Sequence, residues 1–220
     1  MSELQRTRGE AIEGKSRPVP PLGRPDVGEA LLEDLSPADL LGAEHDLIRR
    51  VMSALRRQSR RIEEERQVDP VFLTTVVDFI TTYAGAVHHG KEEEILFRQL
   101  HEKPLSEEER QTMEELAREH VEMRRLVDEL QEAKERYREG EDEALDAIQN
   151  AVEAMVALYP GHMESEDETF FPAAMGYLDE SERQDVVEQM RGHDRAMIHE
   201  KYGSVADELD AGTEDWEMRE

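Results

Sequence analysis

The segment His88-His-Gly-Lys-Glu-Glu-Glu-Ile-Leu-Phe97 aligns without gaps with His162-Met-Glu-Ser-Glu-Asp-Glu-Thr-Phe-Phe171. In both segments a histidine is followed four residues later by a glutamate, so that Glu92 corresponds to Glu166. Residues four apart lie on the same face of an α-helix, one turn from each other. Each segment is therefore predicted to be helical and to present an imidazole and a carboxylate side by side. The pair also indicates an internal repeat.

Four stretches of the chain carry apolar residues at alternating steps of three and four, the spacing of a helix that faces the interior of a bundle. A histidine occupies one inward position in each stripe, and in two stripes a glutamate follows one turn later. The stripes consist of Leu41, His45, Ile48, Met52 and Leu55; Leu73, Val77, Ile80, Ala84, His88, Glu92 and Ile95; Met113, Leu116, His120, Met123, Val127 and Leu130; and Ile148, Val152, Met155, Tyr159, His162, Glu166 and Phe170.

These inward polar residues predict a metal site. One histidine on an apolar face is more often a hydrogen-bonded core residue than a ligand. Four imidazoles and two carboxylates on one seam are harder to explain, because burying each without a partner costs several kcal/mol. A cation among them removes that cost. Nitrogen and oxygen ligands without sulfur suit iron, manganese or zinc, and two carboxylates that can bridge indicate a pair of metal ions.

Helix-start signals divide the chain into helices. Ser36 and Asp69 each precede a proline, and Ser106 and Asp179 each have a glutamate three residues later, as in a capping box. Strand signals are missing. We therefore predict an all-α fold, an up-down antiparallel four-helix bundle with an additional C-terminal helix. The helices are predicted to begin after Ser36, Asp69, Ser106, about Glu143 and Asp179, and the last three to end at Gly140, near Pro172 and at about Leu209.

The chain is predicted to contain three segments. Residues 1–35 include the proline-rich stretch Arg17–Pro25, which cannot be helical, and are expected to form a flexible tail. Residues 36–175 are expected to form the four-helix bundle. Residues 176–220 are expected to add the fifth helix and an acidic tail.

Composition narrows the possible partners. The 220 residues include 54 Asp and Glu against 27 Lys and Arg, a formal net charge of −27. Such a chain repels phosphate backbones and anionic lipid surfaces, so we expect neither nucleic acid nor a membrane as a partner. The absence of cysteine excludes disulfides, thiol nucleophiles and thiolate-bound iron–sulfur clusters. There is no apolar run of about 20 residues and no apolar core near the N-terminus, so we expect a cytoplasmic location.

The sequence resembles the hemerythrin-like (HHE cation-binding) family over about residues 38–175. The resemblance rests on His45-Asp-Leu-Ile, on Glu119-His120 and on the two repeated segments. Members of this family are up-down four-helix bundles around a non-haem di-iron centre. The resemblance implies that the chain binds two iron ions. The implied terminal ligands are His45, His88, His120 and His162, and the implied bridging ligands are Glu92 and Glu166.

The chain departs from the oxygen-carrying hemerythrins on its third helix. Those proteins use five histidines, two of them four residues apart on that helix, whereas here Arg124 follows His120 at that spacing. His89 is a candidate for the missing ligand. If His89 binds metal, one position stays open, which suits reversible dioxygen binding. If it points sideways, since adjacent helical residues diverge by about 100°, more positions are open and oxidation chemistry is favoured. The sequence leaves both alternatives open.

Other polar residues are secondary candidates. His101 and Arg124 are predicted to lie on the surface. His193 and His199 belong to the fifth helix, six residues apart and off a common face, and this helix is expected to cap the bundle or to form a dimer contact; a metal role for either histidine is the less favoured alternative. Tyr159 is either a hydrogen-bond donor close to the metals or a core aromatic residue.

The resemblance implies a function through iron. We expect the protein to bind dioxygen or a related small ligand, such as nitric oxide or peroxide, for sensing, storage or detoxification. The alternatives are a di-iron peroxidase, catalase-like enzyme or oxidase, an iron storage or donation protein, and a structural bundle with hydrogen-bonded histidines. The sequence does not decide whether there is enzymatic turnover, and it does not predict an oligomeric state.

Overall fold

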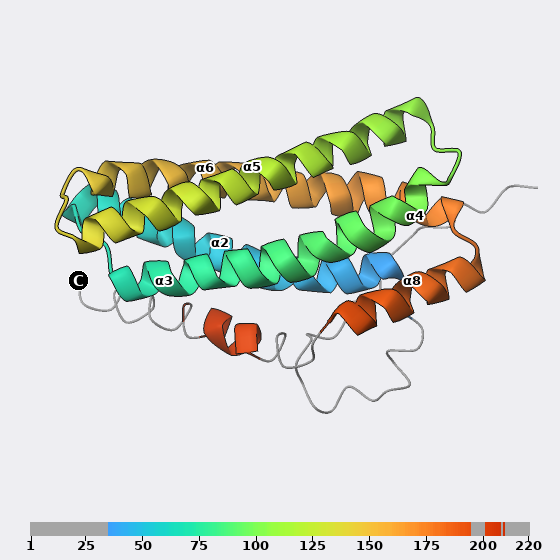
Figure 1. The fold of residues 1–220 in the computed structure, drawn as a ribbon, viewed down its shortest axis with the longest axis horizontal. Helices are drawn as coiled ribbons and strands as arrows, with labels where there is room; N and C mark the ends of the chain where they lie inside the picture. Colours follow the sequence, from blue (N-terminus) through green and yellow to red (C-terminus); the bar gives the residue numbers. More distant parts are fainter. Residues whose placement is uncertain (1–34, 195–200, 208, 210–220) are drawn as a thin grey trace, which may run out of the picture.

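The fold is seen in a computed structural model that describes residues 35–194, 201–207 and 209. The described residues form helices and turns without any strand, as predicted. Four long helical rods run side by side in alternating directions (Figure 1). The rods consist of α2 (Pro37–Glu65); of α3 (Pro70–Phe79), η1 (Ile80–His89), η2 (Glu92–Phe97) and α4 (Arg98–His101); of α5 (Glu107–Arg138); and of α6 (Ala144–Ser165), η3 (Glu166–Phe170), α7 (Phe171–Ala174) and η4 (Met175–Tyr177).

The order of the rods in space is that of an up-down bundle. Helix α6 packs between α2 and α5, and α3 with η1 packs against α5 and α2. The predicted caps are present: Ser36, Ser106 and Asp179 each form a capping box, and the Asp69 side chain accepts a hydrogen bond from the backbone at Val71. The prediction of an antiparallel four-helix bundle is confirmed.

The additional C-terminal helix is shorter than predicted. Helix α8 (Glu180–His193) packs against α2 and η2, outside the four rods (Figure 1). The prediction of one helix to about Leu209 is wrong, because the backbone turns extended at Asp194, with φ −68° and ψ 123°. The Asp194 carboxylate there forms an ion pair with Lys91. A second helical stretch covers residues 201–207. His199, residues 1–34 of the predicted N-terminal tail (1–35) and residues 210–220 of the predicted acidic tail lie outside the described residues.

The fourth rod continues past both of its prolines. Pro160 lies inside α6, and Pro172 lies in the first turn of α7, a position that tolerates a missing backbone donor. The predicted end near Pro172 is therefore early, since the α-helix runs to Ala174 and a 3₁₀ turn follows it.

The regular α-helix is interrupted three times by π-helical turns. They lie at η1 and η2 on the second rod and at η3 on the fourth. A π turn contains one more residue per hydrogen-bonded loop than an α turn and often marks a functional site. All three overlap or adjoin the repeated histidine–glutamate segments, and no sequence signal predicted them.

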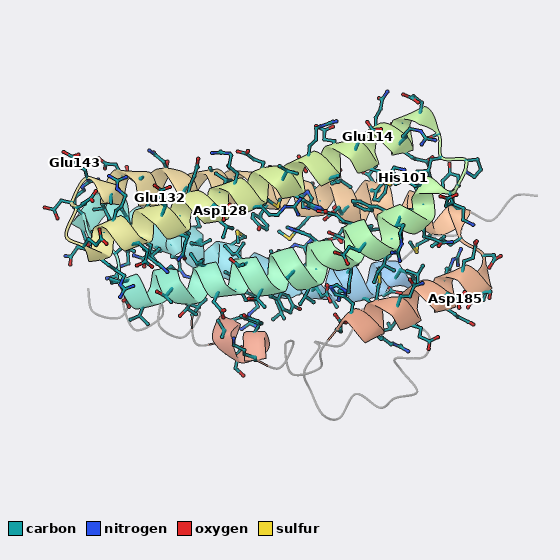
Figure 2. The ribbon with its side chains drawn as sticks, in the orientation of Figure 1. His101, Glu114, Asp128, Glu132, Glu143 and Asp185 are labelled. Carbon is teal, nitrogen blue, oxygen red and sulfur yellow. The ribbon has the colours of Figure 1, made fainter. Side chains whose placement is uncertain are left out.

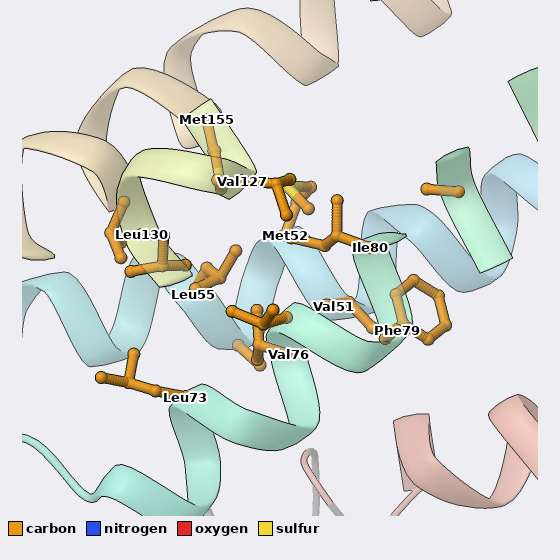
Figure 3. Close-up of a cluster of buried hydrophobic side chains, with 14 of the residues drawn as sticks. Val51, Met52, Leu55, Leu73, Val76, Phe79, Ile80, Val127, Leu130 and Met155 are labelled. Atoms are coloured by element: carbon orange, nitrogen blue, oxygen red, sulfur yellow. The ribbon is translucent and has the colours of Figure 1, made fainter. Parts of the chain in front are cut away.

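Apolar side chains from all four rods fill one half of the bundle. Figure 3 shows this cluster, in which residues of α2, α3, η1, α5 and α6 meet. A second cluster fills the other end, beneath α8. The predicted stripes lie inside: every one of their members is buried. The polar stripe residues therefore lie between two apolar clusters.

The second rod is the most apolar of the long helical stretches that the structure describes. By length and composition alone, the helical stretch Pro70–His101 is long and apolar enough to cross a membrane. In the structure this stretch forms one wall of the bundle, and its apolar residues contribute to both core clusters.

Much of the negative charge lies on the outer helix faces. The carboxylates labelled in Figure 2 are examples, and each belongs to an exposed residue. Solvent screens such groups. The labelled carboxylates are Glu114, Asp128, Glu132, Glu143 and Asp185.

Candidate metal centre

Seven buried side chains predicted as ligands come together between the two apolar clusters. They form two groups, and within each group the donor atoms lie within 4.8 Å of one another. The first and second rods supply most members of the first group, and the third and fourth rods supply most members of the second. The first group is His45, His88, Glu92 and Glu166, and the second is His89, His120 and His162.

The two carboxylates connect the groups. One oxygen of Glu92 lies 3.4 Å from Nε2 of His88, and its other oxygen lies 3.4 Å from Nε2 of His120. One oxygen of Glu166 lies 3.2 Å from Nε2 of His45, and the other lies 3.2 Å from Nε2 of His162. Each carboxylate thus presents one oxygen to each group, which is the arrangement of a ligand that bridges two cations.

His89 lies inside the site together with its neighbour. Its side chain is only 2% exposed, and its ring stacks on that of His120 with centroids 4.0 Å apart. On a regular α-helix His88 and His89 would diverge, but both lie at the end of the π-helical segment η1, where the helix is wider. The alternative in which His89 points sideways does not describe this structure.

The imidazoles are oriented by carboxylates at their outer edges. Four histidines each have Nδ1 within 2.9 Å of a carboxylate oxygen, so Nδ1 is inferred to carry the proton and Nε2 the lone pair. Such carboxylate–histidine pairs fix metal-binding imidazoles in many proteins. The pairs are His45 with Asp167, His88 with Glu44, His120 with Glu93 and His162 with Glu119.

The inner edges of these rings face one another. Nε2 of His45 lies 2.9 Å from Nε2 of His88, and Nε2 of His120 lies 3.1 Å from Nε2 of His162. If every Nδ1 keeps its proton, neither partner in these contacts has a proton to donate, and two lone pairs meet. A cation near each pair would accept both lone pairs. The donor set and its orientation therefore fit metal ions.

The carboxylates and His89 have unsatisfied buried atoms. Both oxygens of Glu92 and of Glu166, and Nδ1 of His89, have no hydrogen-bond partner of good geometry among the described residues. Leaving such atoms buried costs free energy that a bound cation offsets. This observation again fits a metal site.

The pKa values of the buried groups in the site are shifted in opposite directions. Burial, with the nearby charges of Glu166 and Glu44, raises the pKa of Glu92 well above its usual value. Burial and the neighbouring imidazoles hold the pKa of His88 and of His89 well below the usual value. Burial lowers the pKa of His162, but the charge of Glu166 and the hydrogen bond to Glu119 outweigh it and raise the pKa to about 9. The groups therefore prefer different protonation states when no cation balances them.

The outer carboxylates were missed by the sequence reasoning. Their positions give a signal in retrospect, because each of them adjoins a stripe residue in the sequence. Glu44 and Glu119 each precede a stripe histidine, and Glu93 and Asp167 each follow a stripe glutamate. Lys91, which is fully buried, was also missed.

The secondary candidates lie outside the two groups. His101 is exposed at the end of α4 (Figure 2). The His193 ring forms a hydrogen bond with the Ala86 carbonyl oxygen at 2.9 Å. The Arg124 side chain is about half exposed and donates to Glu93. Tyr159 is buried with its ring centroid 6.4 Å from that of His89, and its hydroxyl has no partner among the described residues.

A comparison with models of known protein families identifies the family of this chain. The model of the Hemerythrin HHE cation binding domain matches residues 36–174, and it matches again over residues 112–220. The chain belongs to this family. The hemerythrin HHE domain binds cations, and the buried histidine–glutamate groups fit that property. No curated protein and no solved structure gives a significant match to this hemerythrin HHE chain.

The hemerythrin HHE site has an approximate internal two-fold symmetry. Glu44 precedes His45 but binds the histidine of the next rod, and Glu119 precedes His120 and does the same. Likewise, the residue after each stripe glutamate, Glu93 or Asp167, binds the histidine of another rod. The symmetry agrees with the repeat in the sequence and with the second family match. Two residues at the site have no counterpart of the same kind in the other repeat. In the alignment of the two segments, His89 corresponds to Met163 and Lys91 corresponds to Ser165.

A His89→Ala variant tests the fifth imidazole. We expect it to bind metal about 10–100-fold more weakly in the second group, because one of three imidazoles is lost. Metal analysis after dialysis against limiting metal would measure the content per chain. His101→Ala, which alters an exposed histidine, is the matched control. Equal metal content in the two variants would show that His89 is not a ligand.

Proposed function

We propose that this hemerythrin HHE protein binds two iron ions and, through them, dioxygen or a related small ligand such as nitric oxide or peroxide. The observation that carries the proposal is the position of Glu92 and Glu166, each with one oxygen beside each histidine group. Five imidazoles and two carboxylates without sulfur form a donor set that suits iron. When bound, ferrous iron supplies the electrons that dioxygen binding requires.

The two ions would be inequivalent. The second group offers three imidazoles and the first only two, while both share the carboxylates. The ion held by His45 and His88 therefore has the fewer protein ligands and the more room for an external ligand. Burial of both histidines limits that position to small molecules.

A pocket lies beside one of the candidate ligands. A pocket of about 350 Å³ lies between η1, α5 and α6, and His89 and Tyr159 line it together with Met123 and Val127. Its lining is mostly apolar, which favours neutral molecules such as dioxygen and nitric oxide over ions. We propose that small ligands enter through this pocket beside His89 and pass on from there to the open position at His45 and His88.

Stopped-flow spectroscopy tests the proposed function. The protein is reconstituted with ferrous iron under anaerobic conditions and mixed with dioxygen. The proposal expects an absorption band that forms with dioxygen and disappears when dioxygen is removed. Irreversible oxidation with rapid consumption of added peroxide would instead support a di-iron enzyme. Iron that leaves readily to a chelator, without a response to dioxygen, would support iron storage or donation.

A Val127→Phe variant tests the route. The larger ring should narrow the pocket and slow nitric oxide binding to the ferrous protein by about tenfold, equivalent to about 1.4 kcal/mol in the barrier. The equilibrium affinity and the iron content should change little. Val121→Phe is the matched control, since Val121 lies on the same helix but is 60% exposed. Equal association rates in both variants would place the route elsewhere.

A further inference from the structure

Lys91 is a charged residue in the interior of the protein. Its side chain is fully buried, and its ammonium group donates to the carboxylate of Glu44 and to Asp194, the latter at 2.5 Å. A buried ammonium group persists only where it is paired. The ion pairs of Lys91 are with Glu44 and Asp194, neither of which belongs to the two metal-binding groups.

The chain of contacts from Lys91 leads to a candidate ligand. Glu44, which is 1% exposed, accepts a hydrogen bond from Nδ1 of His88 at 2.9 Å. This contact holds the His88 ring with Nε2 toward His45 and the centre of the site. A carboxylate in this position fixes both the tautomer and the direction of a metal-binding imidazole.

The repeat provides an internal comparison. Glu119 makes the equivalent contact with His162, but its side chain is 29% exposed and water can solvate its charge. The position equivalent to Lys91 is Ser165. The half of the site with the buried carboxylate Glu44 therefore contains a lysine. The half with the partly exposed carboxylate Glu119 has a serine at the equivalent position.

The end of α8 contributes to the burial on this side. His193 donates to the Ala86 carbonyl oxygen, and a Cβ atom at Gly90 would lie 3.0 Å from Nε2 of His193. Glycine at this position thus permits α8 to lie close against the second rod. Asp194, directly after the helix, then reaches Lys91. The additional helix both covers the region and supplies a counter-charge.

We propose that Lys91 and Asp194 are positioning residues for His88. Together they occupy the space around Glu44 that solvent would otherwise fill, so that this carboxylate is held in place while it orients the His88 ring. In this arrangement α8 lies outside the four-helix bundle, yet the residue at its end helps to position a ligand in the His45 and His88 half of the metal site. The inference rests on the proposed metal-binding function, but the ring orientation can be observed without metal.

The test compares Lys91→Met with Lys134→Met in the full chain. Lys134 is also a buried lysine, 4% exposed, but it belongs to α5 and contacts Gln131 and Glu135. Nitrogen NMR of the metal-free protein monitors the His88 ring N–H, assigned with a His88→Gln variant. We expect a slowly exchanging ring N–H in the wild type and in Lys134→Met, and its loss in Lys91→Met. Titration with Co²⁺ should show one of two ions bound about 10–100-fold more weakly only in Lys91→Met.

A second set of variants keeps the test decisive if Lys91→Met fails to fold. Lys91→Gln removes the buried charge but keeps an N–H donor and should fold, yet it should lose part of the protection of the ring N–H and the tight binding of one Co²⁺ ion. Asp194→Asn should weaken the same ion about tenfold. The proposal is overturned if these variants keep the ring signal and both Co²⁺ affinities, or if Lys134→Met shows the same losses. A wild type that binds Co²⁺ but not dioxygen would contradict only the proposed function.

Discussion

A Glu166→Ala variant is expected to lose nearly all bound metal, falling from about two ions per chain to almost none. The reason is that one oxygen of Glu166 lies beside His45 and the other beside His162, in different groups. Loss of this side chain would therefore remove a ligand from each of the two proposed ions and the proposed connection between them. Elemental analysis of protein reconstituted with ferrous iron measures the effect.

The control for this variant lies two residues away. Glu168→Ala removes an exposed carboxylate from the same π-helical segment and should keep the full metal content. Far-ultraviolet circular dichroism of both variants would establish that the bundle is intact. A Glu166→Ala protein with wild-type iron content would show that the metal is bound elsewhere.

A Glu92→Leu variant is expected to stabilise the metal-free protein while abolishing its response to metal. Both Glu92 oxygens are buried and have no hydrogen-bond partner of good geometry among the described residues, and burial with the nearby charges of Glu166 and Glu44 raises the pKa of Glu92. Replacing buried ionic groups with apolar side chains of similar volume is often neutral or stabilises proteins by about 1–4 kcal/mol, and we expect the stabilising outcome for Glu92. For a chain of this size, each kcal/mol raises Tm by about 2–4 °C.

The wild type should behave in the opposite way. Metal at about 100 times its dissociation constant adds about 2.7 kcal/mol to the free energy of unfolding, which corresponds to a rise in Tm of about 5–10 °C. A chelator should reverse that rise. Calorimetry with and without Fe²⁺ or Co²⁺ measures both effects, and Glu94→Leu, at an exposed position on the same segment, is the control. If Glu92→Leu lowers the Tm of the metal-free protein, or keeps the metal-induced rise, this account of Glu92 is wrong.

Most of the fold was predictable because it depends on local signals and on periodicity. Ser36, Asp69, Ser106 and Asp179 cap helices as predicted, and the apolar stripes lie in the core. The break at Asp194 was not predictable. It coincides with an ion pair to Lys91, a residue more than one hundred positions away in the sequence, and no local pattern contains that contact.

The inward histidines and glutamates of the stripes could also be predicted, since helical spacing alone brings them to one seam. The position of His89 could not, because it follows from the π-helical turns of η1 and regular α-helical spacing turns it away. The outer carboxylates and Lys91 were hidden for a different reason. On an acidic chain with many solvated charges, a charged residue beside a ligand has no feature that distinguishes it from a surface residue.

The π-helical segment η1 also determines which changes of chain length this protein tolerates. Thr81 is exposed and Thr82 is half-buried, so substitution at either position should be mild. Deletion of either residue is different, because η1 would lose its additional residue and revert toward regular α-helical spacing, which turns His89 away from the site. The second group would then lose an imidazole although every ligand kept its identity. Deletions in this segment are therefore expected to be more damaging than substitutions, and the number of residues here matters as much as their type.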